Sequence, residues 1–424
     1  QLPTTNYQLP TTNYQLPTNT QMKRRKFIQQ TGIFSASSLV AVGANAWVSK
    51  STSATPHSKR LIVIFLRGAV DGLSVVVPYT DNAYYQVRKR IAIPQPDKAG
   101  GVLDLDGKFG LHPSLAGLMP LWKQKNLAFV HACGSHESTR SHFDAQEYME
   151  NGTPVIKKTK DGWMNRLLAL MSVENNPIQA VNVGYDIPRI LAGNAPVATI
   201  PAGRRVAKRL PIDNPNLTTA FDKLYSGNDA LSKTYRDARE ARKALMESDV
   251  EMKLANNGAP LPKGFSRDAQ RLARLMVRDS RIELAFIGLG GWDTHINQGN
   301  SKGQLAQRLQ SLGDGLATLQ KELGEVYKDT NIIVLSEFGR TVKENGNGGT
   351  DHGHGNVMWL LGGNIRGGKI YGDFPGLSSD RLHEGRDLAV TTDFRDVIST
   401  VLQTHMKLDK TKIGKIFPNY QPVS

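Results

Sequence analysis

Short runs of apolar residues recur along the chain, and each of them gives way to polar or glycine-rich sequence. Continuous apolar runs of four to seven residues are typical of strands that are buried on both faces of a sheet. The pattern predicts six such strands. They cover residues 61–66, 127–130, 178–183, 284–289, 332–335 and 357–361.

Helical spacing of apolar residues occurs in two of the stretches between these runs. It predicts one helix over residues 114–125 and a longer one over residues 304–327. Strands that alternate with helices indicate an α/β fold, with a mostly parallel central sheet and helices on both faces. Ligands of such folds bind beyond the carboxyl ends of the strands, and the polar clusters of this chain stand at those ends.

A charged stretch interrupts this alternation. Residues 229–280 predict a helical insertion, because charges crowd residues 237–253 as they do on solvated amphipathic helices. The segment 203–210 is also basic. It predicts a solvated loop, with contact to an anionic substrate as the less favoured interpretation.

The first 59 residues indicate processing rather than folded structure. Residues 1–21 are a low-complexity heptapeptide repeat without a periodic apolar face. Residues 22–46 combine Arg24-Arg25, a short weakly apolar stretch and the cleavage pattern Ala44-Asn45-Ala46, which predicts a twin-arginine signal peptide. Residues 47–59 are then a linker and residues 60–424 the folded domain. We expect the twin-arginine export machinery as a partner and a periplasmic or extracellular location.

Net charge, apolar stretches and cysteine content limit the substrates, partners and covalent links that this chain can have. The formal charge of +15 comes from 53 basic and 38 acidic residues, and without the four cations of residues 23–26 it is 49 − 38 = +11. This excess favours an anionic small-molecule or polymer substrate. No nucleic-acid motif accompanies it, so we expect no nucleic-acid partner. No apolar stretch reaches the roughly 20 residues of a membrane span, and the single cysteine, Cys133, excludes an intrachain disulfide.

Two polar clusters combine carboxylates with imidazoles, which are ligands of divalent metals in hydrolases. Asp293 and His295 follow the apolar run 284–289 and stand two residues apart. In an extended segment both side chains can therefore reach one ion. Asp351, His352 and His354 gather in a glycine-rich loop, where a metal or catalytic role competes with a chance cluster in solvent.

Two further carboxylates follow predicted strands. Glu337 comes after the run 332–335 and is expected at the top of the sheet, as a metal ligand or as the salt-bridge partner of Arg340. Asp71 follows the first strand across a glycine-rich turn, where it can hold metal or cap the turn.

Hydroxyl groups stand beside basic side chains in the segment 138–144. The hydroxyls of Ser138, Thr139 and Ser141 are candidate nucleophiles, with Arg140 to clamp a tetrahedral oxyanion and His142 to assist. Serine and threonine here also suit the N-cap of a helix. Both roles are compatible, because anions often bind at helix N-termini.

Five motifs, in order, resemble a family of twin-arginine-exported proteins, domain-of-unknown-function family 1501, over about residues 60–420. The motifs are Phe65-Leu66-Arg67-Gly68-Ala69-Val70-Asp71-Gly72-Leu73, Arg140-Ser141-His142-Phe143, Gly291-Trp292-Asp293-Thr294-His295, Ser336-Glu337-Phe338-Gly339-Arg340-Thr341 and Gly349-Thr350-Asp351-His352-Gly353. That family is similar to the alkaline-phosphatase-like superfamily, which includes sulfatases and phosphoglycerate mutases. The resemblance implies an alkaline-phosphatase-like three-layer sandwich with metals at the strand ends.

The resemblance also implies individual roles. Asp71 looks like the metal carboxylate after the first strand, and Ser141 stands where the superfamily has its nucleophile. Asp293 and His295 look like the Asp and His of one metal site, although the superfamily usually spaces them four apart.

The second half of the implied site departs further from the superfamily. Glu337 falls where an Asp-His pair normally ends a strand, and Phe338 then occupies the histidine position, so one ligand is missing. His352 precedes a strand much as the last metal histidine does in phosphatases.

Two functions are compatible with these patterns. The first is an exported metal-dependent hydrolase of phosphate or sulfate esters that uses a divalent ion, namely zinc, calcium or magnesium. The second is a non-catalytic exported binding or envelope protein that retains the fold, which the missing ligand at Phe338 favours. Metal content and turnover separate the two.

Overall fold

The computed structural model describes residues 58–156, 159–171, 176, 178–203, 219, 222–227, 229, 232 and 255–420. The expected repeat, the signal peptide and all but the last two residues of the linker lie outside the described residues. So do residues 204–210 of the basic loop and residues 233–254 of the charged insertion.

A single large sheet forms the centre of the described part of the chain. Its nine strands follow the order β11-β5-β10-β9-β1-β8-β6-β7, with β12 paired to β5. The strands are β1 (Arg60–Leu66), β5 (Leu127–Gly134), β6 (Ala180–Val183), β7 (Ala198–Ile200), β8 (Leu284–Leu289), β9 (Thr330–Leu335), β10 (Asn356–Gly362), β11 (Lys369–Tyr371) and β12 (Thr392–Asp393). All six predicted strands are among them.

The sheet is mostly parallel, as the sequence pattern predicted. Strand β1 pairs in parallel with β8 and β9, and β6 pairs in parallel with β7 and β8. Strand β10 runs antiparallel between β5 and β9. Every residue of β1, β8 and β9 is buried, which explains why these strands are continuous apolar runs rather than alternating ones.

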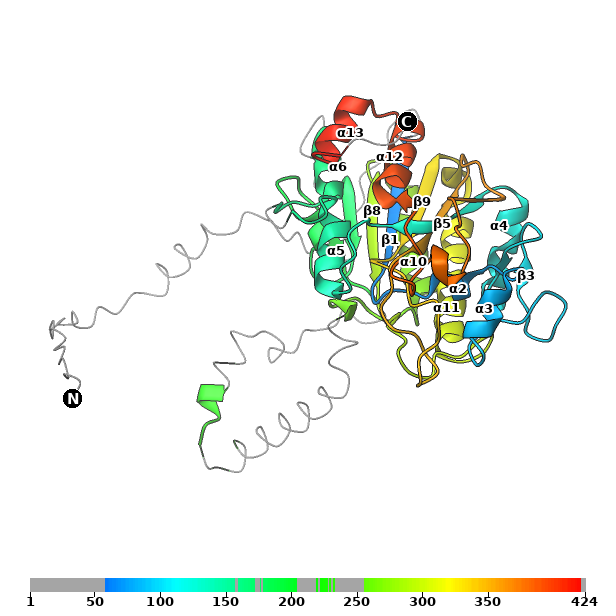
Figure 1. Cartoon of the computed structure of the whole chain (residues 1–424). Coiled ribbons are helices and arrows are strands. Elements are labelled where there is room, and N and C mark those ends of the chain that lie inside the picture. The colour runs from blue at the N-terminus through cyan, green and yellow to red at the C-terminus, as the bar shows by residue number, and fades with distance from the viewer. Residues whose placement is uncertain are drawn as a thin grey trace, which may run out of the picture. The chain divides into compact units, whose positions relative to one another are not determined.

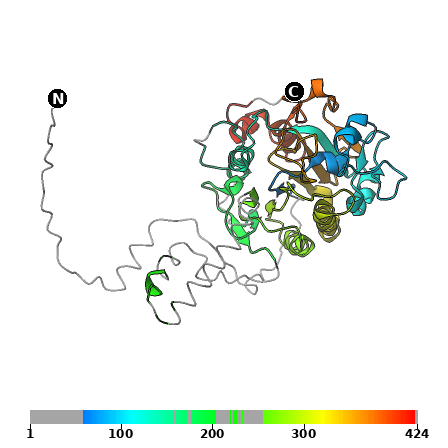
Figure 2. The same cartoon turned by 60° about the horizontal axis from the view of Figure 1, so that its bottom comes forward.

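Helices cover both faces of the sheet (Figure 1). They are α5 (His142–Asn151), α6 (Trp163–Met171), α10 (Phe265–Arg278), α11 (Gln304–Leu323), α12 (Phe394–Thr404) and α13 (Lys410–Ile416). Ile62 and Ile64 of β1 pack in a core with α10 and α11, which lie side by side in Figure 2. Leu61 and Val63 point to the opposite face and pack in a core with α5, α6, α12 and α13. The alternation along one strand therefore produces the three layers of the predicted α/β sandwich.

Short elements complete the described structure. They are α2 (Gly72–Val75), α3 (Asn82–Val87), α4 (Met119–Lys123) and the 3₁₀ helices η1 (Pro113–Leu118), η2 (Arg189–Leu191), η4 (Gly324–Asp329) and η5 (Ser379–Arg381). A second small sheet has the order β2-β4-β3, from β2 (Val76–Val77), β3 (Leu103–Asp104) and β4 (Gly110–Leu111).

Both predicted helices are interrupted in the structure. The segment 114–125 is divided into η1 and α4, each with a proline in its first turn. Because proline lacks an N–H group and suits the start of a helix, Pro120 favours a new helix at that point. The long helix ends at Leu323, where Gly324 takes a positive φ of 54°.

The single cysteine and the absence of a membrane span can also be examined in the described residues. Cys133 is buried, and its Sγ atom lies 3.3 Å from the Sδ atom of Met358. Burial raises the pKa of this thiol well above its usual value. Among the described residues, no helix combines the length and apolar character needed to cross a membrane.

The topology gathers several chain segments at one edge of the sheet. Strands β1, β8 and β9 are parallel, and β5 shares their direction because the antiparallel β10 separates it from β9. Their carboxyl ends therefore meet at the edge where β10 begins. The start of α5, which follows β5, the loop after β8 and the loop before β10 carry the histidines of the candidate site.

Candidate metal centre

His142 is the first residue of helix α5. Its Nδ1 atom lies 2.8 Å from Oε1 of Glu337, a fully buried carboxylate at the end of β9. Gly68 N and Gln146 Nε2 donate to the same oxygen at 2.7 and 2.9 Å. These donors outweigh burial and hold the pKa of Glu337 below its usual value, with His142 as the principal donor. An ionised carboxylate only accepts hydrogen bonds, so Nδ1 of His142 must carry a proton.

His352 is fixed in the same tautomer by a backbone group. Its Nδ1 atom lies 3.0 Å from the carbonyl oxygen of Arg140. A carbonyl oxygen has no proton to give, so Nδ1 of His352 is the donor. The Nε2 atom at the other side of the ring is left to face the centre.

His295 repeats the arrangement with a third acceptor. Its Nδ1 atom lies 3.1 Å from Oδ1 of Asp351, which also accepts a hydrogen bond from Nδ2 of Asn345 at 3.0 Å. Hydrogen bonds from Asn345 and His295 outweigh partial burial and lower the pKa of Asp351. Metal-bound histidines usually donate their outer ring N–H to a carboxylate or carbonyl in this way.

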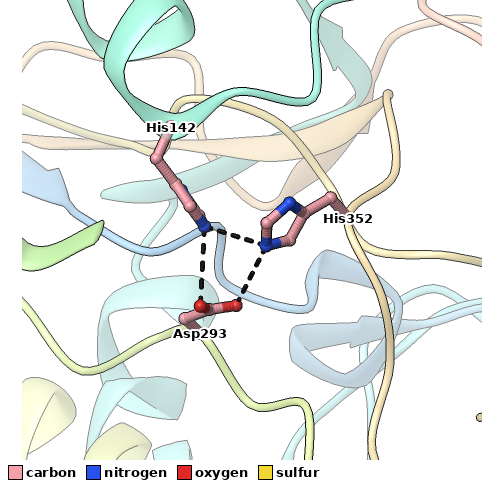
Figure 3. A group of neighbouring side chains, drawn as sticks. All are labelled: His142, Asp293 and His352. Atoms are coloured by element: carbon pink, nitrogen blue, oxygen red, sulfur yellow. Dashed lines mark hydrogen bonds and ion pairs between the residues drawn. The ribbon is translucent and has the colours of Figure 1, made fainter. Parts of the chain in front are cut away.

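The three Nε2 atoms converge on the carboxylate of Asp293. The donor atoms of His142, Asp293 and His352 all lie within 4.8 Å of one another, and Figure 3 shows these side chains pointing toward a common centre. Nε2 of His352 lies 3.0 Å from Nε2 of both His142 and His295. The oxygens of Asp293 lie 2.9 Å from His295, 3.3 Å from His352 and 3.6 Å from His142.

These separations match the edges of a metal coordination shell. Tetrahedral zinc with bonds of about 2.0–2.1 Å to nitrogen and oxygen has its ligand atoms about 3.3 Å apart. The five measured separations between donor atoms of this group run from 2.9 to 3.6 Å. The donor atoms of His142, Asp293 and His352, which all lie within 4.8 Å of one another, could therefore hold a single divalent ion, and His295 borders them through its contacts with His352 and Asp293.

The protonation of the group follows from its contacts. Burial lowers the pKa of His142, but hydrogen bonds to Asp293 and Glu337 outweigh burial and raise it to about 9. The hydrogen bond to Asp293 also raises the pKa of His295. Burial raises the pKa of Asp293, yet the three imidazoles and Arg340 prevail and lower it strongly. The Asp293 carboxylate is therefore ionised. Without a metal, the His142 ring carries a second proton at Nε2, the nitrogen that faces this carboxylate.

Charge at the centre is negative when the imidazoles are neutral. Arg340 Nη1 donates to Oδ1 of Asp293 at 2.5 Å, and both side chains are buried. Three carboxylates, those of Asp293, Glu337 and Asp351, contact the imidazoles and favour a cation among them. The guanidiniums of Arg340 and Arg308 offset part of this negative charge.

Phe338, at the position for which the resemblance implied a missing histidine, forms an apolar wall of the candidate site. Its ring centroid lies 4.9 Å from that of His142 and 5.3 Å from that of His352. The ring limits the space in which the two imidazoles can rotate, and so helps to hold them in place.

The loop after β1 supports Asp293 through its backbone. Gly68 has a φ of 110°, and a Cβ atom on it would lie 2.7 Å from the backbone nitrogen of Asp293. Only glycine tolerates both the conformation and the contact. This explains the glycine in the first of the five motifs.

Asp71, expected as a metal ligand, is held elsewhere. Both of its oxygens accept hydrogen bonds from the guanidinium of Arg88, at 2.6 and 3.0 Å, and both side chains are fully buried. Ser74 and Gln298 also donate to Oδ2, at 2.6 and 2.7 Å. Burial raises the pKa of Asp71, but Arg88 prevails and lowers it. Its carboxylate serves this network, and the group around Asp293 does not include it.

Three other predicted ligands also occupy supporting or separate places. Glu337 and Asp351 bind the outer nitrogens of His142 and His295 rather than the central space. His354 lies outside the group, and its ring stacks on that of His383 at 4.4 Å. Burial lowers the pKa of His354 to about 4.

The predicted catalytic segment divides into three roles. Ser141 is the N-cap of α5, and its Oγ atom accepts a hydrogen bond from Asp144 N at 3.4 Å. His142 belongs to the metal group, a role that the sequence had assigned to other histidines. The guanidinium of Arg140 is bound by Asp387 and Glu384, at 2.7 and 2.5 Å.

Sequence reasoning missed Gln146 and Asp387 as supporting residues, and it offered Glu337 as the partner of Arg340. Gln146 joins Glu337 to α5, and Arg340 binds Asp293 rather than Glu337. Asp387 binds the guanidinium of Arg140. Gln146 stands four residues after His142, one helical turn along, which is the available signal for a shared face. No local signal marks the other two, because their partners lie 47 and 247 residues away.

Solved structures similar to this chain share low sequence identity with it. A protein in the alkaline phosphatase superfamily from Vibrio parahaemolyticus has 10% identity and a TM-score of 0.37, and the match covers 75% of this chain but only 63% of that protein. Ps i-CgsB in complex with k-i-k-neocarrahexaose has 11% identity and a TM-score of 0.40, with 84% and 74% covered. The lipoteichoic acid synthase LtaP from Listeria monocytogenes has 10% identity and a TM-score of 0.33, with 79% and 74% covered. TM-scores of this size carry no inference about activity or substrate.

A comparison with curated proteins gives no match. A family model does match, over residues 58–417, and it contains all five motifs that carried the resemblance. The predicted membership is thereby confirmed: the chain belongs to the family described as "Protein of unknown function (DUF1501)".

Proposed function

We propose that this chain is an exported metal-dependent hydrolase of phosphate or sulfate esters. The observation that carries the metal part is the convergence of three Nε2 atoms, from His142, His295 and His352, on the carboxylate of Asp293. The ester class rests on the family resemblance. Export through the twin-arginine machinery, to the periplasm or beyond, rests on the signal pattern around Arg24-Arg25.

The donor set favours zinc, or a similar transition metal, over calcium and magnesium. Calcium and magnesium prefer six or more oxygen ligands, whereas imidazole suits zinc, copper, iron and nickel. The group supplies three nitrogens and one carboxylate, from His142, His295, His352 and Asp293. A bound divalent ion would act as a Lewis acid toward a phosphoryl or sulfuryl oxygen of the ester.

Ser141 is the nucleophile of this proposal. It stands directly before His142 and caps the ten-residue helix α5. The positive end of the helix dipole favours the developing negative charge of an attacking oxygen and of an anionic substrate. Asp293, held as an anion by Arg340, keeps the imidazoles oriented while the ester is bound.

A non-catalytic binding or envelope protein is the second candidate. The engagement of Arg140 favours it, because Asp387 and Glu384 already bind the guanidinium that was expected to clamp an oxyanion. Such a protein would bind its anionic partner without turnover.

Two measurements test the first proposal. The full chain is purified from the cell compartment that contains it, and bound metals are quantified by plasma mass spectrometry. Hydrolysis of 4-nitrophenyl phosphate and 4-nitrophenyl sulfate is then followed with and without added zinc. We expect about one bound transition-metal ion per chain and metal-dependent turnover of one ester. A chain without bound metal, or with metal but without turnover of any ester, excludes the hydrolase.

Ser141→Ala needs a control, because it also removes a helix cap. Asp409 caps α13 and accepts a hydrogen bond from Lys412 N at 2.8 Å. Both Ser141→Ala and Asp409→Ala should cost about 1 kcal/mol of unfolding free energy. Only Ser141→Ala should abolish turnover. Equal turnover in the two variants rules out Ser141 as the nucleophile.

A further inference from the structure

His352 is held from two sides by arginines. The carbonyl oxygen of Arg140 accepts the hydrogen bond from its Nδ1 atom at 3.0 Å. Nη2 of Arg386 donates to its backbone oxygen at 2.5 Å. One contact fixes the ring and its tautomer, and the other fixes the backbone from which the ring projects.

A single carboxylate binds both arginines. Oδ2 of Asp387 accepts hydrogen bonds from Nε and Nη2 of Arg140 at 3.2 and 2.7 Å. Arg386 donates to Oδ1 from Nε at 2.9 Å and to Oδ2 from Nη2 at 3.1 Å. Asp387 is fully buried, whereas the two arginines are partly exposed. Its carboxylate therefore holds both charge-assisted pairs from the protein side and defines their geometry.

The backbone around Asp387 is fixed to the same part of the site. Asp387 forms a bridge with Thr341, in the loop that follows β9. The next residue, Leu388, accepts a hydrogen bond from Gly355 N at 2.7 Å, three residues after His352. The carboxylate therefore sits on a segment that cannot shift without moving the loop of His352.

We propose that Asp387 is a positioning residue of the metal centre: through Arg140 and Arg386 it sets the tautomer and orientation of His352, and so the affinity of the centre for a transition-metal ion. This inference rests on the proposed metal centre. It gives Arg140 a structural task in place of the substrate contact expected from its motif. Outer partners of metal-bound histidines change affinity by about 10- to 100-fold when they are mutated.

The test compares Asp387→Asn with the unaltered full chain. The zinc dissociation constant is measured by competition with a chromogenic chelator, and the histidine tautomers by long-range ¹H–¹⁵N spectra of the metal-free, ¹⁵N-histidine-labelled protein. His352→Gln identifies the signals of His352. We expect a dissociation constant about 10-fold or more higher in Asp387→Asn and loss of the pure Nδ1–H signature of His352.

Asp393→Asn is the matched control. Asp393 is also buried, and its carboxylate binds the guanidinium of Arg395 at 2.9 and 2.8 Å. No hydrogen bond or ion pair recorded for it among the described residues involves His352. Removing this charge should leave zinc affinity and the His352 spectrum unchanged, although it perturbs a comparable buried pair.

A second variant guards against misfolding of Asp387→Asn. Arg386 is partly exposed. Arg386→Lys keeps the positive charge but loses the planar guanidinium whose N–H groups bond both Asp387 and His352. It should weaken zinc binding several-fold in the same direction. Unchanged zinc affinity and an unchanged His352 tautomer in either folded variant overturn the role of Asp387.

The two proposals fail in different ways. If the unaltered chain binds no metal, the proposed centre fails, and the tautomer of His352 in the metal-free variants still decides what Asp387 does. If the unaltered chain binds zinc and both variants bind it equally well, only the inference about Asp387 fails.

Discussion

Nε2 of His142 lies 3.0 Å from Nε2 of His352. In each ring the Nδ1 atom already donates, to Glu337 in one case and to the carbonyl of Arg140 in the other. Two neutral rings in that state would place lone pairs against each other. The contact therefore requires either a proton or a cation between the nitrogens. The four predictions below follow from this requirement and from other buried groups of the fold.

Metal binding should stabilise the fold, and the effect should depend on the ion. Zinc at 100 times its dissociation constant should raise the free energy of unfolding by about 2.7 kcal/mol, because only the folded chain assembles the site. Calcium should give a far smaller gain, since three of the four donors are imidazoles. Calorimetric melting of the chelator-treated protein with each ion measures both effects. Equal stabilisation by calcium and zinc would contradict the nitrogen-rich site.

Glu337→Gln should weaken the metal centre without unfolding the chain. One oxygen of the carboxylate accepts hydrogen bonds from three N–H groups. A glutamine amide has a single, neutral oxygen. It would either lose one of these hydrogen bonds or place its own NH₂ group against a neighbouring N–H donor. We expect metal affinity to fall by about 10- to 100-fold, measured by isothermal titration calorimetry. Glu322→Gln, at a surface pair with Arg274, is the control and should bind metal normally.

Asp71→Asn should reduce stability but not metal content. It breaks a fully buried ion pair with Arg88, and removing one partner of such a pair costs about 3–5 kcal/mol. Urea unfolding gives the free energy, and plasma mass spectrometry gives the bound metal per folded chain. If the variant folds but no longer binds metal, Asp71 would be a metal ligand after all.

Stability should fall as the pH drops from about 6.5 to 4. His112 and His131 are fully buried, and burial lowers the pKa of each from 6.5 to about 4. As the pH falls, the unfolded chain takes up these protons before the folded chain does. The folded state therefore loses stability between pH 6.5 and 4, and these two histidines cause no further loss below pH 4. The loss amounts to about 3 kcal/mol for each histidine.

His131→Phe tests that assignment. Its ring already packs against Phe109 and Phe374, so an aromatic replacement fits the space but cannot titrate. The variant is less stable at neutral pH because Val76 O and Ala132 N lose their partner. Between pH 6.5 and 4 its unfolding free energy should change less steeply than that of the unaltered chain, and an equal slope argues against His131.

The strands were predictable from sequence because burial on both faces leaves a continuous apolar run, as in β1 and β9. The edge at which the polar clusters meet was predictable as well, because parallel strands share their carboxyl ends. The helix breaks were harder to place. Their positions depend on single residues, such as Pro120 and Gly324, within segments whose apolar spacing continues past them.

Roles within the site were much less predictable. A carboxylate at a strand end is placed by topology, but its partner is chosen by packing: Asp71 lies against Arg88, and Glu337 lies behind His142. Which nitrogen of an imidazole faces the centre depends on an acceptor far away in sequence. For His352 that acceptor is a backbone carbonyl, which no residue pattern reveals.

His142 and His352 are 210 residues apart in the chain, and His295 and His352 are 57 apart. A cation held by all three would close two long loops at once and act as a reversible cross-link, whose benefit grows with the chain length that it encloses. No short fragment of this protein could carry such a link. The three histidines come together only when strands far apart in the sequence have paired, so such a link would form late in folding rather than nucleate it.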